Sequence, residues 1–148
     1  MRREIPIKIE GKKAKGNRPA RKGAKISPPA GDERLGKKQA WKPGNMLYPL
    51  PAVLVTVADS KGRDNIITVA WTGTVCTNPP MVYISVRPER HSYHMIEETG
   101  EFAINLTTES LLRAVDYCGV KSGRDVDKFK EMHLTRQRAS EISAPLLG

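Results

Sequence analysis

Two short runs rich in β-branched residues, joined by a glycine-containing turn, constrain the fold of this chain most. The first run spans residues 51–58, the second spans 65–71, and the connection over 59–64 includes Gly62. β-Branched side chains favour strands, and a connection this short joins two strands only as an antiparallel hairpin. The sequence therefore predicts an antiparallel sheet and excludes the parallel sheet of the common nucleotide-binding folds.

Two more strands are predicted further along. Residues 81–86 follow a two-residue period and 102–106 form a short apolar run, while Pro79 and Pro80 break the chain because proline has no N–H for a sheet. The predicted class is α+β or mainly β, with a barrel-like sheet and short helices. Because a closed barrel usually needs more than four strands, we expect the fold to be incomplete at the C-terminus, to be completed by a partner chain, or to keep an exposed sheet edge.

Three helical segments complete the predicted elements. The first spans 92–99, with Ser92 as its N-cap and Gly100 as its stop. A second helix is predicted over 108–117, and one or two helical turns over 126–132.

Charge is distributed unevenly along the chain. The 148 residues include 25 Lys and Arg and 16 Asp and Glu, a formal net charge of +9. Residues 1–42 hold 14 basic and 4 acidic side chains, a net of +10, whereas 43–148 hold 11 and 12, a net of −1. The first segment has one aromatic residue, Trp41, so it cannot bury enough surface to offset the entropy of folding. We therefore predict a disordered basic tail over 1–42 and a globular domain over 43–148.

Residue usage also bears on location. No apolar run approaches the roughly 18 residues of a membrane-spanning helix, and the charged N-terminus lacks the apolar stretch of a secretory signal. The two cysteines, Cys76 and Cys118, lie far apart in the sequence, which favours free thiols over a disulfide framework. We expect a cytoplasmic protein that does not act at a membrane.

A threonine-rich stretch follows the second predicted strand. Thr72, Thr74 and Thr77 surround Gly73 without any bulky charged neighbour, and we interpret this stretch as a polar turn. Glycine lets a flat ligand approach the main chain, and threonine hydroxyls suit polar ring edges or a phosphate. The alternative is an edge strand rich in threonine.

Three cationic or titratable side chains precede the first predicted helix. Arg87, Arg90 and His91 lie just before Ser92, where free N–H groups and the helix dipole attract anions. Together with the threonine-rich stretch they predict a site for a flat ring joined to a phosphate monoester, although a loop with surface arginines is the alternative. Neither segment matches a dinucleotide fingerprint or a P-loop.

Five blocks of the sequence resemble one family in its own order. They are 42–51, 71–80, 90–93, 100–106 and 116–129, and they are similar to the flavin reductase-like, FMN-binding split-barrel family, closest to flavoredoxin. The resemblance implies a split β-barrel that binds FMN non-covalently, as a homodimer with the flavin near the subunit interface. It also implies either reduction of flavins by NADH or NADPH or electron transfer to a redox protein partner.

The resemblance assigns a set of cofactor-binding residues. The flavin ring would be lined largely through main-chain groups, and other residues would hold the phosphate. A flavin supplies its own redox chemistry, so no catalytic side chain is expected. No metal site is expected either, because the His91 and His94 pair lacks enough further ligands. The candidates are Thr68, Ala70, Trp71, Thr72, Gly73, Thr74, Val75 and Cys76 for the ring, Arg87, His91 and Ser92 for the phosphate, Asn105 in the same pocket, and Lys128 with Ser122 and Asp127 in a loop near the flavin.

A function of another class remains open at this point. The basic tail over 1–42 is not a feature of the family, and charge alone lets such a segment contact nucleic acid or an acidic partner. The alternative hypothesis is therefore a non-enzymatic protein that binds nucleic acid or a partner through its tail.

Overall fold

The computed structural model describes residues 45, 47 and 49–148. The predicted disordered tail over 1–42 lies outside the described residues. No helix in the described part of the chain is long and apolar enough to cross a lipid bilayer.

The predicted hairpin forms the centre of the domain. Strands β1 (Val53–Ala58) and β2 (Asp64–Val69) pair antiparallel, and β5 (Ala103–Leu106) pairs antiparallel with the other edge of β1. The turn between β1 and β2 is closed by the carboxylate of Asp59, which accepts hydrogen bonds from the backbone N–H groups of residues 61 and 63. The antiparallel sheet predicted from the sequence is confirmed, in the order β2-β1-β5.

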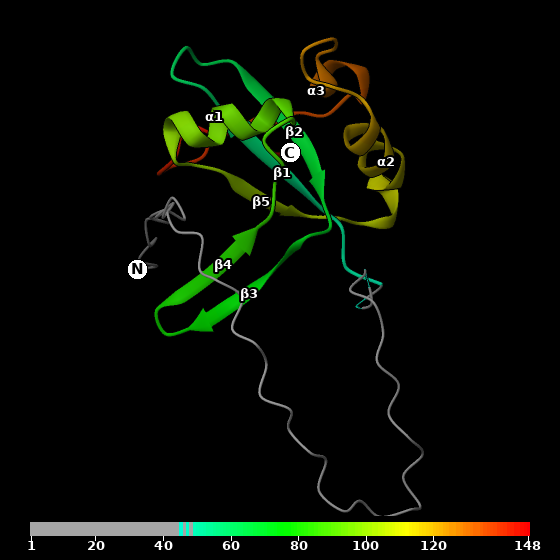
Figure 1. Cartoon of the computed structure of the whole chain (residues 1–148). Helices are drawn as coiled ribbons and strands as arrows, with labels where there is room; N and C mark the ends of the chain where they lie inside the picture. Colours follow the sequence, from blue (N-terminus) through cyan, green and yellow to red (C-terminus); the bar gives the residue numbers. More distant parts are fainter. Residues whose placement is uncertain (1–44, 46, 48) are drawn as a thin grey trace, which may run out of the picture. The chain divides into compact units, whose positions relative to one another are not determined.

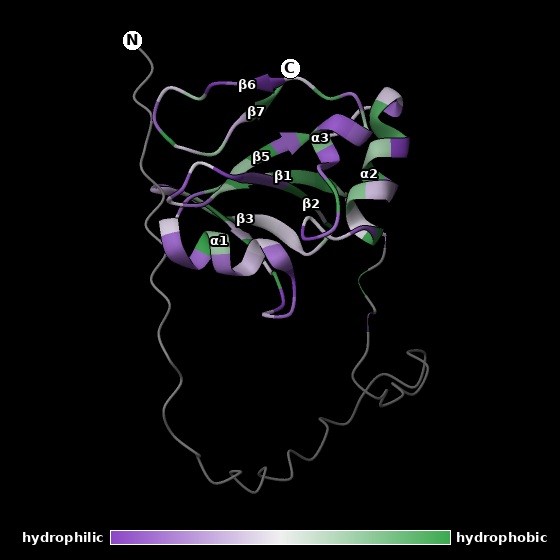
Figure 2. Ribbon diagram, turned by 90° about the horizontal axis from the view of Figure 1, so that it is seen from above, coloured by the Kyte–Doolittle hydropathy of each residue, from purple (hydrophilic) through white to green (hydrophobic). Residues whose placement is uncertain are grey.

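Both faces of this sheet are covered, and successive residues of β1 face opposite sides. Val55 packs in a cluster with Met95 of α1 (His91–Thr99), whereas Leu54 packs in a second cluster with Cys118 of α2 (Leu112–Val120). Figure 2 shows α1 on one side of the sheet and α2 on the other. All six residues of β1 are therefore buried, which explains why five of them are apolar; Thr56 is the exception.

The threonine-rich stretch is a strand and not the polar turn that we predicted. β3 (Thr72–Thr77) pairs antiparallel with β4 (Pro80–Ile84) in a separate ribbon, with an irregular register between Thr74 and Cys76. This ribbon extends away from the central sheet (Figure 1). The turn instead falls at Asn78 and Pro79, which are joined by a cis peptide bond. Threonine is β-branched, so the alternative of a threonine-rich strand is the correct one.

The helices follow the prediction with shifted boundaries. α1 ends at Gly100, whose φ of 71° is the left-handed conformation that glycine favours. The second predicted helix is a 3₁₀ turn over Glu109–Leu111 that leads into α2, and α2 continues through Gly119. The last predicted helical segment is α3 (Lys128–Glu131).

A small hairpin that we did not predict from the sequence lies at the C-terminal end of the described residues. Strands β6 (Arg136–Gln137) and β7 (Leu146–Leu147) pair antiparallel, and Leu147 of β7 packs against the cluster that contains Leu54. Asn105 on β5 holds this hairpin, because its Oδ1 accepts from the N–H of Leu147 at 3.0 Å while its Nδ2 donates to the carbonyl of Leu54 at 3.1 Å.

Candidate functional site

Two adjoining cavities lie beside β2. The first, here called the β4 cavity, has a volume of about 420 Å³ and lies between residues 67–71 and the segment 85–87 that follows β4. The second, here called the α1 cavity, has a volume of about 240 Å³ and lies between the start of α1 and the segment 118–124. Both are lined by Ile67 and Arg90, so they form neighbouring parts of one cleft.

The α1 cavity is strongly cationic. Its lining includes four Lys and Arg side chains, and Glu89 is the only acidic residue among the residues that line it. His91 also lines the cavity, and its pKa is lowered first by burial and then by the positive charges of Arg124, Arg63 and Lys128. A neutral His91 at pH 7 still has one N–H to donate. Such a concentration of donors and positive charge suits an anion. The four cationic side chains are Arg90, Lys121, Arg124 and Lys128.

Lys128 is the most unusual of these side chains. It is 4% exposed, and its Nζ donates to the carbonyls of Ile66 at 2.8 Å and Cys118 at 2.9 Å. Burial lowers its pKa from 10.5 to about 8, so the ammonium form still dominates at pH 7. An ammonium has three donors, and these two carbonyls leave one for a ligand in the cavity.

Ser92 occupies the first turn of α1 but does not cap it. The helix begins at His91, its N-cap residue is Arg90, and no side chain caps it, so our prediction of Ser92 as the N-cap is wrong. Ser92 lies two residues after the N-cap, and its Oγ instead accepts a hydrogen bond from Nδ2 of Asn65 at 2.9 Å. The uncapped helix start leaves N–H groups available beside the cationic cavity.

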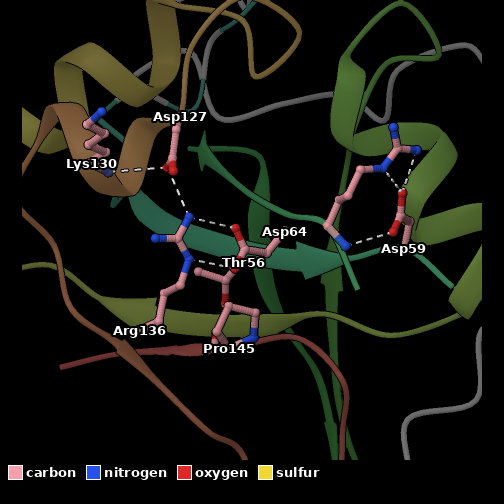
Figure 3. Close-up of polar contacts among 8 residues, drawn as sticks. Thr56, Asp59, Asp64, Asp127, Lys130, Arg136 and Pro145 are labelled. Carbon is pink, nitrogen blue, oxygen red and sulfur yellow. Dashed lines mark hydrogen bonds and ion pairs between the residues drawn. The ribbon is translucent and has the colours of Figure 1, made fainter. Parts of the chain in front are cut away.

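An ion-pair network holds the start of α3, where Lys128 lies. Arg136 donates to Asp64 of β2 at 2.7 and 3.0 Å and to Asp127 at 2.9 Å, as Figure 3 shows. The guanidinium also lies 4.1 Å from the centre of the Phe129 ring. Asp127, which the resemblance assigned to the flavin loop, is engaged by Arg136 and by the N–H of Lys130 at the start of α3.

The cleft brings together about half of the predicted site residues. Thr68 lines the β4 cavity, but its hydroxyl donates to the carbonyl of Val115 in α2. Predicted residues on the β4 cavity are Thr68, Ala70, Trp71 and Arg87, and those on the α1 cavity are His91, Ser92, Ser122 and Lys128.

The other predicted residues line neither cavity. Those of β3 are engaged within the ribbon: the hydroxyl of Thr72 donates to the carbonyl of Tyr83 at 2.7 Å, and a Cβ on Gly73 would lie 2.9 Å from the Tyr83 ring. The Cys76 thiol contacts the carbonyl of Asn78. The residues outside both cavities are Thr72, Gly73, Thr74, Val75, Cys76, Asn105 and Asp127.

Several polar residues of the cleft, among them Asn65, Ser85 and Arg124, were absent from our predicted set. Asn65 and Arg124 line the α1 cavity, and Ser85 lines the β4 cavity. The one available signal was Asn65, a polar residue at the start of a mostly apolar strand. Arg124 lies in a turn more than 50 residues from Asn65, and no sequence period links two such positions.

Comparison with known proteins identifies the fold. The family model described as "Flavin reductase like domain" matches residues 45–148. Flavoredoxin of Desulfovibrio vulgaris is 34% identical with a TM-score of 0.69, over 76% of this chain and 61% of that protein. The FMN-binding domain of a flavin reductases-like enzyme from Shewanella baltica is 26% identical with a TM-score of 0.61, over 66% and 51% of the two chains.

A protein of Aeropyrum pernix described as uncharacterized is 33% identical over 104 residues, which are 70% of this chain and 39% of that protein. The chain therefore spans between about four and six tenths of the length of these relatives. The similarity confirms the predicted α+β split-barrel class and the resemblance to flavoredoxin. The chain belongs to the flavin reductase-like domain family.

Proposed function

We propose that the domain binds FMN non-covalently, with the ring in the β4 cavity and the phosphate in the α1 cavity. The observation that carries this proposal is that a more apolar cavity adjoins a cationic one along a single strand. Together their volumes fall within the roughly 300–1,000 Å³ typical of small-molecule sites. Similarity to a flavoredoxin and to an FMN-binding domain supports the choice of flavin.

The donors of the α1 cavity fit a phosphate monoester. Lys128 and Arg90 would neutralise its charge, and Ser92 and neutral His91 would donate hydrogen bonds to its oxygens. Arg87 lines the β4 cavity, and its carbonyl accepts from the N–H of Arg90, which lines both cavities; from there Arg87 would contact the chain that joins ring and phosphate. The flavin, when bound, supplies the redox chemistry, and the protein binds and orients it.

We further propose an oxidoreductase role, as an NADH- or NADPH-dependent flavin reductase or as an electron carrier of the flavoredoxin type. The 34% identity to a flavoredoxin supports the second form. Oxidation of NADH or NADPH in the presence of excess free flavin tests the first. A protein that retains reduced FMN but does not turn over the nicotinamide is a carrier.

A homodimer through the β3–β4 ribbon is part of the proposal. Five large apolar side chains on or beside the ribbon are between 39% and 59% exposed, a patch that suits a partner surface. Residues 72–76 line neither cavity of their own chain, so in a dimer they would contact the flavin bound by the partner subunit. Light scattering at increasing concentration tests this, with Val75→Arg expected to give a monomer. The five side chains are Trp71, Val75, Met81, Val82 and Tyr83.

Titration of the purified protein with FMN tests cofactor binding directly. We expect quenching of flavin fluorescence and weaker binding of riboflavin, which has the same ring without the phosphate. Riboflavin binding equal to FMN binding would remove the phosphate assignment. Protein without flavin affinity, but with salt-sensitive binding to nucleic acid, would favour the alternative function in the basic tail.

A further inference from the structure

Two neutral polar side chains are buried together in the wall of the α1 cavity. Asn65 of β2 is 5% exposed and Ser92 of α1 is 1% exposed, and both line the cavity. The amide nitrogen of Asn65 donates to the hydroxyl oxygen of Ser92 at 2.9 Å. Buried polar groups are usually hydrogen-bonded, so the direction of this hydrogen bond decides which partner the Ser92 hydroxyl can still bind.

The direction of the bond leaves the Ser92 proton free for a ligand. A hydroxyl has one donor and two lone pairs, and Asn65 occupies a lone pair. The neighbouring cavity side chains Arg90 and Lys128 are donors, so they offer no acceptor. Within the described part of the chain, the Ser92 hydroxyl donates to no carbonyl. A ligand oxygen that only accepts would match it.

The loop after α2 restricts the Asn65 amide. A Cβ on Gly123 would lie 2.2 Å from Oδ1 and 2.7 Å from Nδ2 of Asn65, which is closer than real carbon contacts allow. The backbone at Gly123 therefore packs directly against the amide group. Close packing on this side limits rotation of the amide and holds its donor toward Ser92.

We propose that Asn65 is a positioning residue that directs the Ser92 hydroxyl toward an oxygen-only anion, a phosphate monoester, in the α1 cavity. Asn65 acts through Ser92 and thereby sets the preference for FMN over riboflavin. This inference rests on the proposed function, since it names the ligand group that the same site selects.

A double-mutant cycle tests the coupling between the two residues. Asn65→Asp replaces the donating amide with a carboxylate of the same shape that only accepts, so it would take the Ser92 proton. Dissociation constants for FMN and riboflavin are measured for the wild type, Asn65→Asp, Ser92→Ala and the double variant. Repulsion between the new carboxylate and phosphate is present in both Ser92 backgrounds, so it cancels when the two are compared.

The expected result is a loss specific to the phosphate. Ser92→Ala should weaken FMN binding about ten-fold or more, the effect of one charge-assisted hydrogen bond, and leave riboflavin binding unchanged. Asn65→Asp should weaken FMN binding at least about ten-fold more in the Ser92 background than in the Ser92→Ala background. Equal losses in the two backgrounds, or equal losses for FMN and riboflavin, would overturn the proposal.

Two further measurements keep the test decisive. If Asn65→Asp does not fold, Asn65→Ala is compared in the same two backgrounds, and equal effects there again overturn the proposal. Inorganic phosphate is titrated separately, with amide chemical shifts of α1 as the readout. Phosphate binding that depends on Asn65 through Ser92, in a protein without FMN affinity, would uphold the inference and refute the proposed function. A wild-type protein that binds neither FMN nor phosphate overturns both.

Discussion

Replacing Lys128 with methionine removes a cation that is buried between β2 and α2. The side chain is 4% exposed, and its Nζ donates to the carbonyls of Ile66 and Cys118. Burial lowers its pKa from 10.5 to about 8, and the positive charge of Arg90 acts in the same direction. We therefore expect the lysine and methionine proteins to differ in how their stability depends on pH.

The sign follows from the number of protons bound. Below pH 8 the lysine is protonated in both the folded and the unfolded protein, and above pH 10.5 it is neutral in both. Between these values the unfolded chain binds more protons, so the free energy of unfolding of the wild type rises with pH. A pKa of about 8 in place of 10.5 corresponds to a total rise of about 3 kcal/mol.

The hydrogen bonds decide the comparison at neutral pH. Methionine removes the cost of burying the charge, which is about 3 kcal/mol. It also leaves the two carbonyls without a hydrogen-bond donor, which costs roughly 1–3 kcal/mol for each carbonyl. These effects oppose each other, so we expect similar stabilities at pH 7. The wild type should then become more stable than Lys128→Met by about 3 kcal/mol as the pH approaches 10.5.

Urea denaturation of both proteins between pH 7 and 10.5 measures this difference. The thiol of Cys118 interacts with Lys128, and burial raises its pKa, so both proteins are also measured in a Cys118→Ala background. Stability curves that stay parallel over this range would refute the reasoning, because a lysine with an ordinary pKa contributes no such slope.

The remaining predictions concern the loop at Gly123, the core at Leu54 and the ion pairs of Arg136. Gly123→Ala should destabilise the protein by roughly 1–3 kcal/mol and weaken FMN binding, since the added methyl group overlaps Asn65. Urea denaturation and FMN titration measure the two effects, and an unchanged stability and affinity would contradict the prediction. Leu54→Ala, at a fully buried position of β1, should cost roughly 2–5 kcal/mol in the same denaturation assay, and a loss below 1 kcal/mol would contradict the assigned core. Arg136→Gln should cost about 1 kcal/mol at low salt, with the difference shrinking in 1 M NaCl because the guanidinium is partly exposed; a loss independent of salt would contradict the ion-pair account.

Local patterns in the sequence determined the elements that depend on nearby residues. The β1–β2 hairpin follows from β-branched runs on either side of a glycine-containing turn, and the end of α1 follows from Gly100. The cationic character of the segment around Arg90 could also be predicted from the sequence, because its charges and the helix start lie together in the chain. Each of these inferences needs only short-range sterics and charge.

Residues 72–76 show where such patterns become ambiguous. Threonine and glycine suit both a polar turn and a strand, and pairing with residues 80–84 decided in favour of the strand. Propensity describes one residue at a time, whereas the ladder depends on a partner several residues away.

Only the tertiary structure decided which side chains share the cleft. Asn65 meets Ser92 across 27 positions, and Lys128 reaches the carbonyl of Ile66 across 62. Such contacts depend on how α1, α2 and α3 pack on the two faces of the sheet, and no sequence period encodes them. Asn105 has a polar side chain that could bind a ligand, but it holds the C-terminal hairpin instead. Its position in the sheet, and not its chemistry, determined its partners.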